Sequence, residues 1–326
     1  MVDKAFQMKN FVLQISKLVL QIIRVARPIH WVKNLALFGA LLLTGTLYET
    51  GLFGDVLLAF ISFSFATSAT YIFNDIWDAS LDKTHPVKQF RPIASGKLPI
   101  FIAILELFLL VFLSLTIAIS LNQLLFTIIL VYLTIQSLYS LGLKNIPVID
   151  ILIIASGFVL RVYAGAFVIN AHLSVWFLLC VVSASLFLAS GKRRSEINLL
   201  EATDGGTRKS LTKYTKELLN SYVTMFGNAT WMSWSLYTFF ESPKASLSFW
   251  MVLAELSRAT TIDKLMMLTI PVVIFGIMRY EALIFEGKSE APEKLLLTDS
   301  GLVIAVGLWV TLVYWIIYSG VSVSGI

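Results

Sequence analysis

Long apolar stretches, separated by short polar segments, run through almost the whole chain. A helix needs about 20 largely apolar residues to cross the hydrocarbon layer of a bilayer, and each stretch approaches or exceeds that length. The pattern predicts about nine membrane-spanning helices, near residues 34–52, 56–73, 99–119, 122–141, 148–169, 173–190, 219–240, 265–285 and 302–320. We therefore expect an all-α integral membrane protein that forms a single transmembrane domain over residues 1–326.

A different pattern precedes the first span, in residues 11–26. Apolar side chains recur there at helical spacing, and polar side chains fill the other positions. The apolar positions are Phe11, Ile15, Leu18, Val19, Ile22 and Val25, and the polar ones are Gln14, Lys17, Gln21 and Arg24. This arrangement is typical of an amphipathic helix in the plane of the membrane interface, which we predict here.

The composition excludes an ordinary soluble domain. Hydrophobic residues make up 57% of the chain and charged residues only 14%, whereas about 25% of the residues in soluble domains are charged. The single cysteine, Cys180, lies inside an apolar stretch and excludes an intrachain disulfide.

The net charge of +5 is spread unevenly along the chain. Nearly all basic residues lie before the first predicted span or after an even-numbered span. The positive-inside rule then places the N-terminus and the polar segments 74–98 and 191–217 in the cytoplasm. Because the charge is an asymmetry across a bilayer and no DNA-reading motif is present, we expect no nucleic-acid partner. Each of the two polar segments follows an even-numbered predicted span, and this placement suggests two helical halves that share one site.

The first group of candidate functional residues lies where the second predicted span ends. Asp75, Asp78 and Asp82 follow Asn74 at a spacing that puts the carboxylates on one helix face, with adjacent members about 5–6 Å apart. Oxygen ligands of this kind suit a hard divalent cation that holds a phosphorylated substrate. The alternative is an ordinary solvated helix end.

Basic residues follow this carboxylate row within the same polar segment. Lys88 and Arg91 could grip phosphate oxygens, the arginine as a fork and the lysine as a point charge.

The second group is at the end of the sixth predicted span, in residues Gly191 to Glu196. On a helix, Lys192 and Arg193 lie about one turn from Glu196. The two basic side chains could then bind an anion, and the nearby carboxylate could orient it or bind a metal ion. The alternative is that basic residues stand there for topology alone.

The third group consists of charges at membrane depth. Asp150 and Arg161 would share one helix face about 16 Å apart, and an unpaired charge there costs at least a few kcal/mol, about 2.5 or more. Arg161 is therefore a candidate for the site, although an ion pair with another helix would also explain it. Tyr139 and Lys144 close the preceding span and could join the site, as could Lys33 before the first span. Lys144 could instead be a topology determinant.

Residues Asn74 to Asp82 resemble the first motif of the UbiA superfamily of membrane-embedded prenyltransferases. The resemblance covers roughly residues 24–320 and implies helices around a central polar cavity, with Mg²⁺ held by Asp75, Asp78 and Asp82. Members that prenylate aromatic rings carry a second aspartate-rich motif after helix 6, where this chain has Gly191 to Glu196.

In this feature the chain resembles another branch of the superfamily, the decaprenyl-phosphate phosphoribosyltransferases. The stretches that resemble the branch are 74–96, 139–144, Asp150 with 160–166, and 192–196. The resemblance implies Mg²⁺-dependent transfer of 5-phosphoribose from phosphoribosyl diphosphate to a polyprenyl phosphate, with a product used in cell-wall biosynthesis. A lipid phosphate acceptor and a diphosphate donor repel each other, and basic side chains relieve this repulsion where a second carboxylate cluster would increase it.

We expect the enzyme in the inner (plasma) membrane of a bacterial cell, in contact with membrane lipids. The predicted catalytic residues are Asp75, Asp78, Lys192 and Arg193, and the predicted substrate-binding residues are Asn74, Lys33, Lys88, Arg91, Tyr139, Lys144, Asp150, Arg161 and Glu196. Two alternatives stay open: transfer of a prenyl group from a prenyl diphosphate to an aromatic or other small acceptor, and a transporter whose pathway Asp150 and Arg161 line. The sequence leaves a homo-oligomer open.

Overall fold

The computed structural model describes residues 2–85, 87–202, 213–241, 262–286 and 292–319. Within these ranges the chain is almost entirely helical and contains no β-strand. The chain divides into two compact units: Met1–Leu35 with Leu58–Lys144 form unit 1, and Ala36–Leu57 with Asn145–Ile326 form unit 2. Each unit is described by itself.

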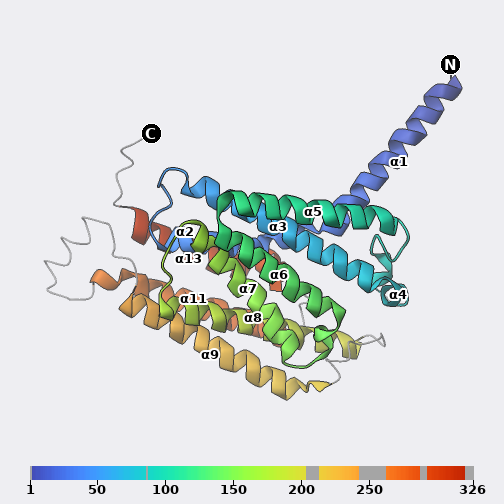
Figure 1. Cartoon of the computed structure of the whole chain (residues 1–326). Helices are drawn as coiled ribbons and strands as arrows, with labels where there is room; N and C mark the ends of the chain where they lie inside the picture. Colours follow the sequence, from blue (N-terminus) through green and yellow to red (C-terminus); the bar gives the residue numbers. More distant parts are fainter. Residues whose placement is uncertain (1, 86, 203–212, 242–261, 287–291, 320–326) are drawn as a thin grey trace. The chain divides into compact units, whose positions relative to one another are not determined.

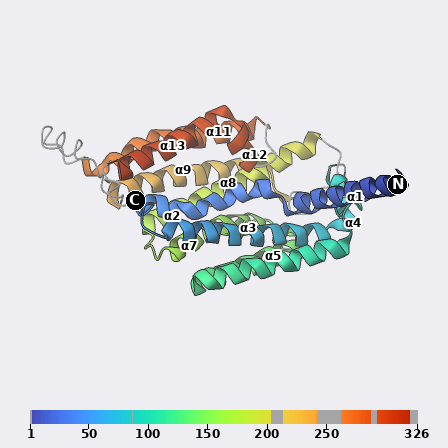
Figure 2. The ribbon, with the colours of Figure 1, turned by 90° about the horizontal axis from the view of Figure 1, so that it is seen from above.

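Unit 1 is built on two long apolar helices that lie side by side (Figures 1 and 2). These are α3 (Leu52–Trp77), which belongs to unit 1 from Leu58 on, and α5 (Ile100–Leu121). The Ser62 hydroxyl donates to the Ser114 carbonyl at 2.7 Å, and the Ser114 hydroxyl donates to the Ser62 carbonyl at 2.8 Å. The other helices that include unit 1 residues are α1 (Val2–Ala26), η1 (Pro28–Leu37), α4 (Ala79–Asp82), η2 (Lys88–Phe90), α6 (Gln123–Leu141) and η3 (Leu143–Asn145).

A buried apolar cluster fixes α1 and the segment after α4 to α3 and α5. Its buried members are Val25, Ile72, Ile93, Leu98 and Ala103, with Leu18 and Ile22 packed against them. The helix predicted at residues 11–26 is therefore present and begins earlier, at Val2. Two of its predicted apolar positions, Ile15 and Val19, remain 46% and 47% exposed. Its location in the membrane interface stays a prediction.

Unit 2 contains the remaining helices. They are α2 (Phe38–Leu43), α7 (Ile149–Val168), α8 (Val175–Ala202), α9 (Lys216–Phe240), η5 (Ile262–Thr269), α11 (Ile270–Phe285), α12 (Pro292–Thr298) and α13 (Ser300–Tyr318). A core of large side chains includes Trp234, Tyr237, Met266, Val313 and Ile316.

One close backbone contact in unit 2 depends on a glycine of α7. A Cβ added at Gly165 would lie only 1.9 Å from the Leu37 carbonyl oxygen, so α7 touches the backbone at the end of η1 directly. Any side chain at this position would force the two segments apart.

The membrane fold class is confirmed, but the count of nine spans is not. Among the described residues, seven helices are long and apolar enough to cross a bilayer: Leu52–Trp77, Ile100–Leu121, Gln123–Leu141, Ile149–Val168, Val175–Ile197, Leu265–Phe285 and Ser300–Tyr318. The segment predicted at 219–240 is helical as α9, but this helix is not among the seven.

The stretch predicted as a span at 34–52 is not a single α-helix. The chain there forms the end of η1 and the six-residue helix α2, and then a series of turns before α3. Gly45 and Gly51 take φ values of 79° and 88° in these turns. That left-handed conformation suits glycine and ends a right-handed helix.

The polar segment predicted to begin at residue 191 also begins later. Helix α8 continues through Ala202, so Lys192, Arg193 and Glu196 are helical residues. Residues 203–212 lie outside the described part of the chain.

Candidate functional site

The carboxylate row lies on an almost unbroken helical path from α3 into α4. The Asp78 amide donates to the Asn74 carbonyl at 2.9 Å, and the Asp82 amide donates to the Asp78 carbonyl at 2.8 Å. Asp75 and Asp82 are buried, with 2% and 3% exposure. The helical path therefore continues past Asn74 and includes Asp75, Asp78 and Asp82.

Two arginines hold the Asp75 carboxylate. Nη2 of Arg27 lies 2.6 Å from one oxygen of Asp75 and 2.7 Å from the other. Nη1 of Arg91 lies 3.0 Å from Asp75 and 2.6 Å from Oδ2 of Asp82, so one guanidinium joins both acids. The apolar anchors Ile93 and Leu98 fix the segment that carries Arg91.

The remaining carboxylate belongs to a separate ion pair. Nζ of Lys144 lies 2.6 Å from each oxygen of Asp78 and 3.4 Å from Oδ1 of Asn74. We call Asp75, Asp78 and Asp82 with Arg27, Arg91 and Lys144 the acidic cluster. Its carboxylates and cations are equal in number, so its formal charges cancel.

The donor chemistry of the acidic cluster fits a hard divalent cation. Carboxylate oxygens from Asp75, Asp78 and Asp82, with the Asn74 amide oxygen, are the ligand types that Mg²⁺ prefers. No three such side chains converge on one point in the described residues. In this geometry side-chain cations hold the carboxylates that a metal ion would bind.

The sequence did not single out Arg27 as a site residue. It directly follows α1 and has a φ of 51°. The Ala26 carbonyl accepts a hydrogen bond from the Ser68 hydroxyl at 2.7 Å, and Trp31 Nε1 donates to the same hydroxyl at 2.9 Å. These bonds tie the end of α1 to α3 beside Asp75, a placement that depends on tertiary contacts. The arginine guanidinium also lies 5.0 Å above the Tyr71 ring, in a cation–π contact.

A histidine closes the turn that leads to Arg91. The backbone amides of Val87 and Lys88 donate to Nδ1 of His85 at 3.2 and 3.3 Å. Partial burial, and then the positive charge of Lys88, lower the pKa of His85 below its usual value, while Asp82 acts in the opposite direction. The imidazole is thus held in the neutral form that can accept both bonds.

Unit 2 carries a second set of linked side chains, which we call the α8 cluster: Asp150, Arg193, Glu196 and Tyr214. Nε of Arg193 lies 2.7 Å from Oδ2 of Asp150, and both side chains have 0% exposure. Nη1 of Arg193 lies 2.5 Å from Oε2 of Glu196, whose side chain is 23% exposed. The predicted proximity of Arg193 and Glu196 on one helix is confirmed. A guanidinium buried between two carboxylates is suited to orient Glu196.

Tyr214 completes the α8 cluster and was also missed from the sequence. Its hydroxyl donates to Oδ1 of Asp150 at 2.7 Å. No motif surrounds this tyrosine, so the sequence offers no signal for it.

The neighbours of Arg193 have different environments. Nε of Arg194 donates to Oδ1 of Asn220 at 2.6 Å, and its guanidinium lies 5.8 Å from the Phe285 ring, so this residue packs against α9 and α11. Arg161 is buried on α7, where Nη1 donates to the Gly157 carbonyl of the same helix at 2.5 Å.

The other predicted site residues, which include the predicted catalytic residue Lys192, are partly buried. They are Lys33, Lys88 and Tyr139 in unit 1 and Lys192 in unit 2. Their roles, like those of the clusters, stay predictions.

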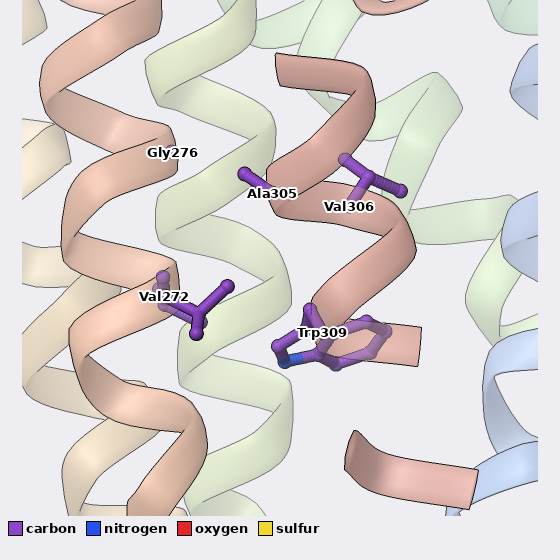
Figure 3. Close-up of a pocket in the computed structure, with 6 residues that line it drawn as sticks. Val272, Gly276, Ala305, Val306 and Trp309 are labelled. Atoms are coloured by element: carbon purple, nitrogen blue, oxygen red, sulfur yellow. The ribbon is translucent and has the colours of Figure 1, made fainter. Parts of the chain in front are cut away.

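An apolar groove of about 200 Å³ lies between α11 and α13 (Figure 3). It is lined by Val272, Val273, Gly276, Ala305, Val306 and Trp309. None of these residues belongs to either cluster or can ionise, so the groove has no group suited to phosphate chemistry.

Seven helices among the described residues are long and apolar enough to cross a bilayer, and they define the chain as an integral membrane protein. The sequence matches the UbiA prenyltransferase family over residues 35–254, and the chain belongs to this family of transferases.

Relatives with assigned names resemble the chain along most of its length. A *Corynebacterium glutamicum* protein named decaprenyl-phosphate phosphoribosyltransferase is 37% identical over 302 residues, which cover 91% of this chain and 86% of the relative. A *Mycolicibacterium smegmatis* protein of the same name is 35% identical over 299 residues, which cover 90% and 92%.

A solved structure supports the fold. The UbiA homologue from *Archaeoglobus fulgidus*, described as bound to DMAPP and Mg²⁺, superimposes with a TM-score of 0.67 at 18% identity. The match covers 91% of this chain and 99% of that chain.

Proposed function

We propose that this protein transfers 5-phosphoribose from phosphoribosyl diphosphate to a polyprenyl phosphate and releases diphosphate. An oxygen of the lipid phosphate attacks C1 of the ribose, the bond from C1 to the diphosphate oxygen breaks, and C1 is inverted. The phosphate nucleophile is already ionised at neutral pH, so the reaction needs little base catalysis.

The observation that carries the proposal is the similarity to relatives named decaprenyl-phosphate phosphoribosyltransferase over about nine-tenths of the chain, at 91% and 90% coverage. The basic stretch at Lys192 and Arg193, where the resemblance to aromatic-ring prenyltransferases would require aspartates, supports the same assignment.

The acidic cluster is assigned to the diphosphate of the donor. Asp75, Asp78 and Asp82, with Asn74, would hold Mg²⁺, which when bound supplies positive charge for the leaving diphosphate. Arg27, Arg91 and Lys144, which contact these carboxylates, would bind phosphate oxygens of the donor. Because the ion pairs balance the carboxylates beforehand, no carboxylate of the cluster is buried without a counter-charge before substrate binds.

The α8 cluster and its neighbour Lys192 are assigned to the sugar and the acceptor. Glu196 is the partly exposed carboxylate of the cluster and accepts hydrogen bonds from ribose hydroxyls. Lys192 binds the lipid phosphate as a point charge, while Arg193, held between Asp150 and Glu196, orients the glutamate.

The protein is assigned to the inner membrane of a bacterial cell, with the N-terminus and the segments that carry both clusters in the cytoplasm. The excess of lysine and arginine in these segments supports this orientation.

Donor choice tests the proposal. Purified protein in detergent is given polyprenyl phosphate with phosphoribosyl diphosphate, or a small acceptor with a prenyl diphosphate, and diphosphate release is followed. We expect release with the sugar donor only. Release with the prenyl donor alone would contradict the proposal.

Prenyl transfer is the second candidate function. It is favoured by the fold shared with the homologue whose structure is described as bound to DMAPP and Mg²⁺. That function requires no acceptor for ribose hydroxyls, so replacing Glu196 by glutamine would leave it unchanged.

A further inference from the structure

Tyr214 lies just before α9 and its ring is fixed by three helices. It is buried in an apolar cluster with Ile151, Ala189, Ile197 and Leu219. These contacts come from α7, α8 and α9, so the position of the phenol depends on the packing of the whole helical group.

The Tyr214 hydroxyl joins two points at the start of α7. It accepts a hydrogen bond from the Val148 amide at 2.5 Å and donates to Oδ1 of Asp150 at 2.7 Å. Val148 has a φ of 69°, which is rare for a β-branched residue and is sustained only when its surroundings hold it. Burial raises the pKa of the Tyr214 phenol, so the hydroxyl keeps the proton that it donates.

Asp150 connects Tyr214 to Arg193, and Arg193 in turn contacts Glu196. The carboxylate receives Tyr214 on Oδ1 and Arg193 on Oδ2, and Arg193 reaches Glu196 with its Nη1. Three successive contacts therefore connect the phenol to Glu196. The Asp150–Arg193 contact is a buried ion pair, and in a low-dielectric environment linked polar contacts strengthen one another.

We propose that Tyr214 is a positioning residue that sets the orientation of the Glu196 carboxylate through Asp150 and Arg193. This inference rests on the proposed function, in which Glu196 accepts hydrogen bonds from the ribose of the donor. Without the Tyr214 hydroxyl, Asp150 loses one of its fixed partners, Arg193 can rotate with it, and Glu196 is no longer held where the sugar binds.

The test uses wild-type protein, Tyr214→Phe, Glu196→Gln and the double variant. Tyr214→Phe retains the ring and removes only the hydroxyl. We expect each single variant to raise the KM for phosphoribosyl diphosphate about tenfold, as the loss of one hydrogen bond to a charged group does. The KM for polyprenyl phosphate stays near the wild-type value, and the double variant is no worse than Glu196→Gln alone.

Tyr222→Phe is the matched control. Tyr222 packs against the same apolar cluster from α9, and its hydroxyl is in none of the bonds that define the α8 cluster. We expect its KM values to match those of wild type. Asp150→Asn interrupts the chain one bond further on, and it is the second variant if Tyr214→Phe does not accumulate as folded protein.

A wild-type KM in Tyr214→Phe, or effects of Tyr214→Phe and Glu196→Gln that simply multiply, would overturn the inference. Thermal unfolding of the same four proteins without substrate tests the connection independently of the reaction, since linked side chains give non-additive shifts. If wild-type protein transfers no phosphoribose, the proposed function fails. The unfolding shifts then still decide whether Tyr214 and Glu196 are coupled.

Discussion

At the scale of single residues, the acidic cluster combines residues that sequence patterns predict with residues that they do not. The row from Asn74 to Asp82 is visible because its spacing puts oxygen ligands on one helix face. Arg27 is less visible, because it reaches Asp75 from 48 residues earlier in the chain. Only the packing of α1 against α3 brings them together.

Substitution of a carboxylate tests the proposed role of the acidic cluster most directly. Asp75→Asn removes a charge that two arginines contact and that, in the proposed function, binds a metal ion. A metal ion contributes several kcal/mol to transition-state stabilisation, so we expect the rate of transfer to fall about 100-fold or more. The rate is measured at saturating donor across a Mg²⁺ titration.

Asp55→Asn is the control for this substitution, because Asp55 lies in the first turn of the same helix, α3. Its protein should keep the wild-type rate, and both variants should elute as folded protein from a sizing column. An Asp75→Asn protein with the wild-type Mg²⁺ dependence would remove Asp75 from the site.

His85 should make the turn before Arg91 sensitive to acid. Because the folded state lowers its pKa, its contribution to stability is complete above the ordinary value of about 6.5. That contribution is lost as the pH falls through the lower folded value. Hydrogen exchange at the Val87 and Lys88 amides, corrected for intrinsic pH dependence, should therefore quicken on acidification.

His85→Asn supplies an acceptor oxygen that does not titrate. We expect exchange in this variant to be nearly independent of pH over the same interval. If both proteins showed the same acid dependence, another group would be responsible.

At the scale of helices, hydrophobic patterns locate the long elements well and the irregular ones poorly. The spans predicted at 99–119 and 122–141 correspond to α5 and α6 within a few residues. The stretch predicted at 34–52 is divided among the end of η1, α2 and a series of turns. Apolar content does not show where the backbone turns, and Gly45 and Gly51 permit turns there. Likewise, the extension of α8 to Ala202 carries polar residues that resemble a loop in composition.

Close helix packing gives a prediction at this scale. Gly165→Ala would place a Cβ against the Leu37 carbonyl oxygen, where neither backbone can yield cheaply. We expect a loss of stability of about 1–3 kcal/mol or more, measured as a lower unfolding temperature in detergent.

Gly307→Ala on α13 is the matched control, because an added Cβ there meets no atom within 4 Å. Alanine is the better helix former, so stability should stay the same or rise by up to about 1 kcal/mol. Equal effects at the two glycines would contradict the close contact between α7 and η1.

At the scale of the whole molecule, the distribution of charge predicts the membrane orientation. Thr50→Cys marks the exposed turn before α3, and Lys97→Cys marks the exposed segment before α5. The native Cys180 is buried and should label poorly. A membrane-impermeant maleimide applied to spheroplasts should label Thr50→Cys, and it should label Lys97→Cys only after the membrane is permeabilised.

The reverse pattern of labelling would place the acidic cluster outside the cell. It would also invert the topology that the lysine and arginine distribution predicts. Labelling of both sites in intact spheroplasts would show that the segment between them does not cross the bilayer as expected.

The proposed reaction rests on family membership, the acidic cluster and the α8 cluster taken together. The most direct measurement incubates purified protein with phosphoribosyl diphosphate labelled in the ribose, polyprenyl phosphate and Mg²⁺, and then extracts the lipid. We predict that label appears in a lipid whose mass equals polyprenyl phosphate plus one phosphoribosyl group, and that chelation of the metal prevents it. A lipid fraction without label, from protein shown to be folded, would contradict the account.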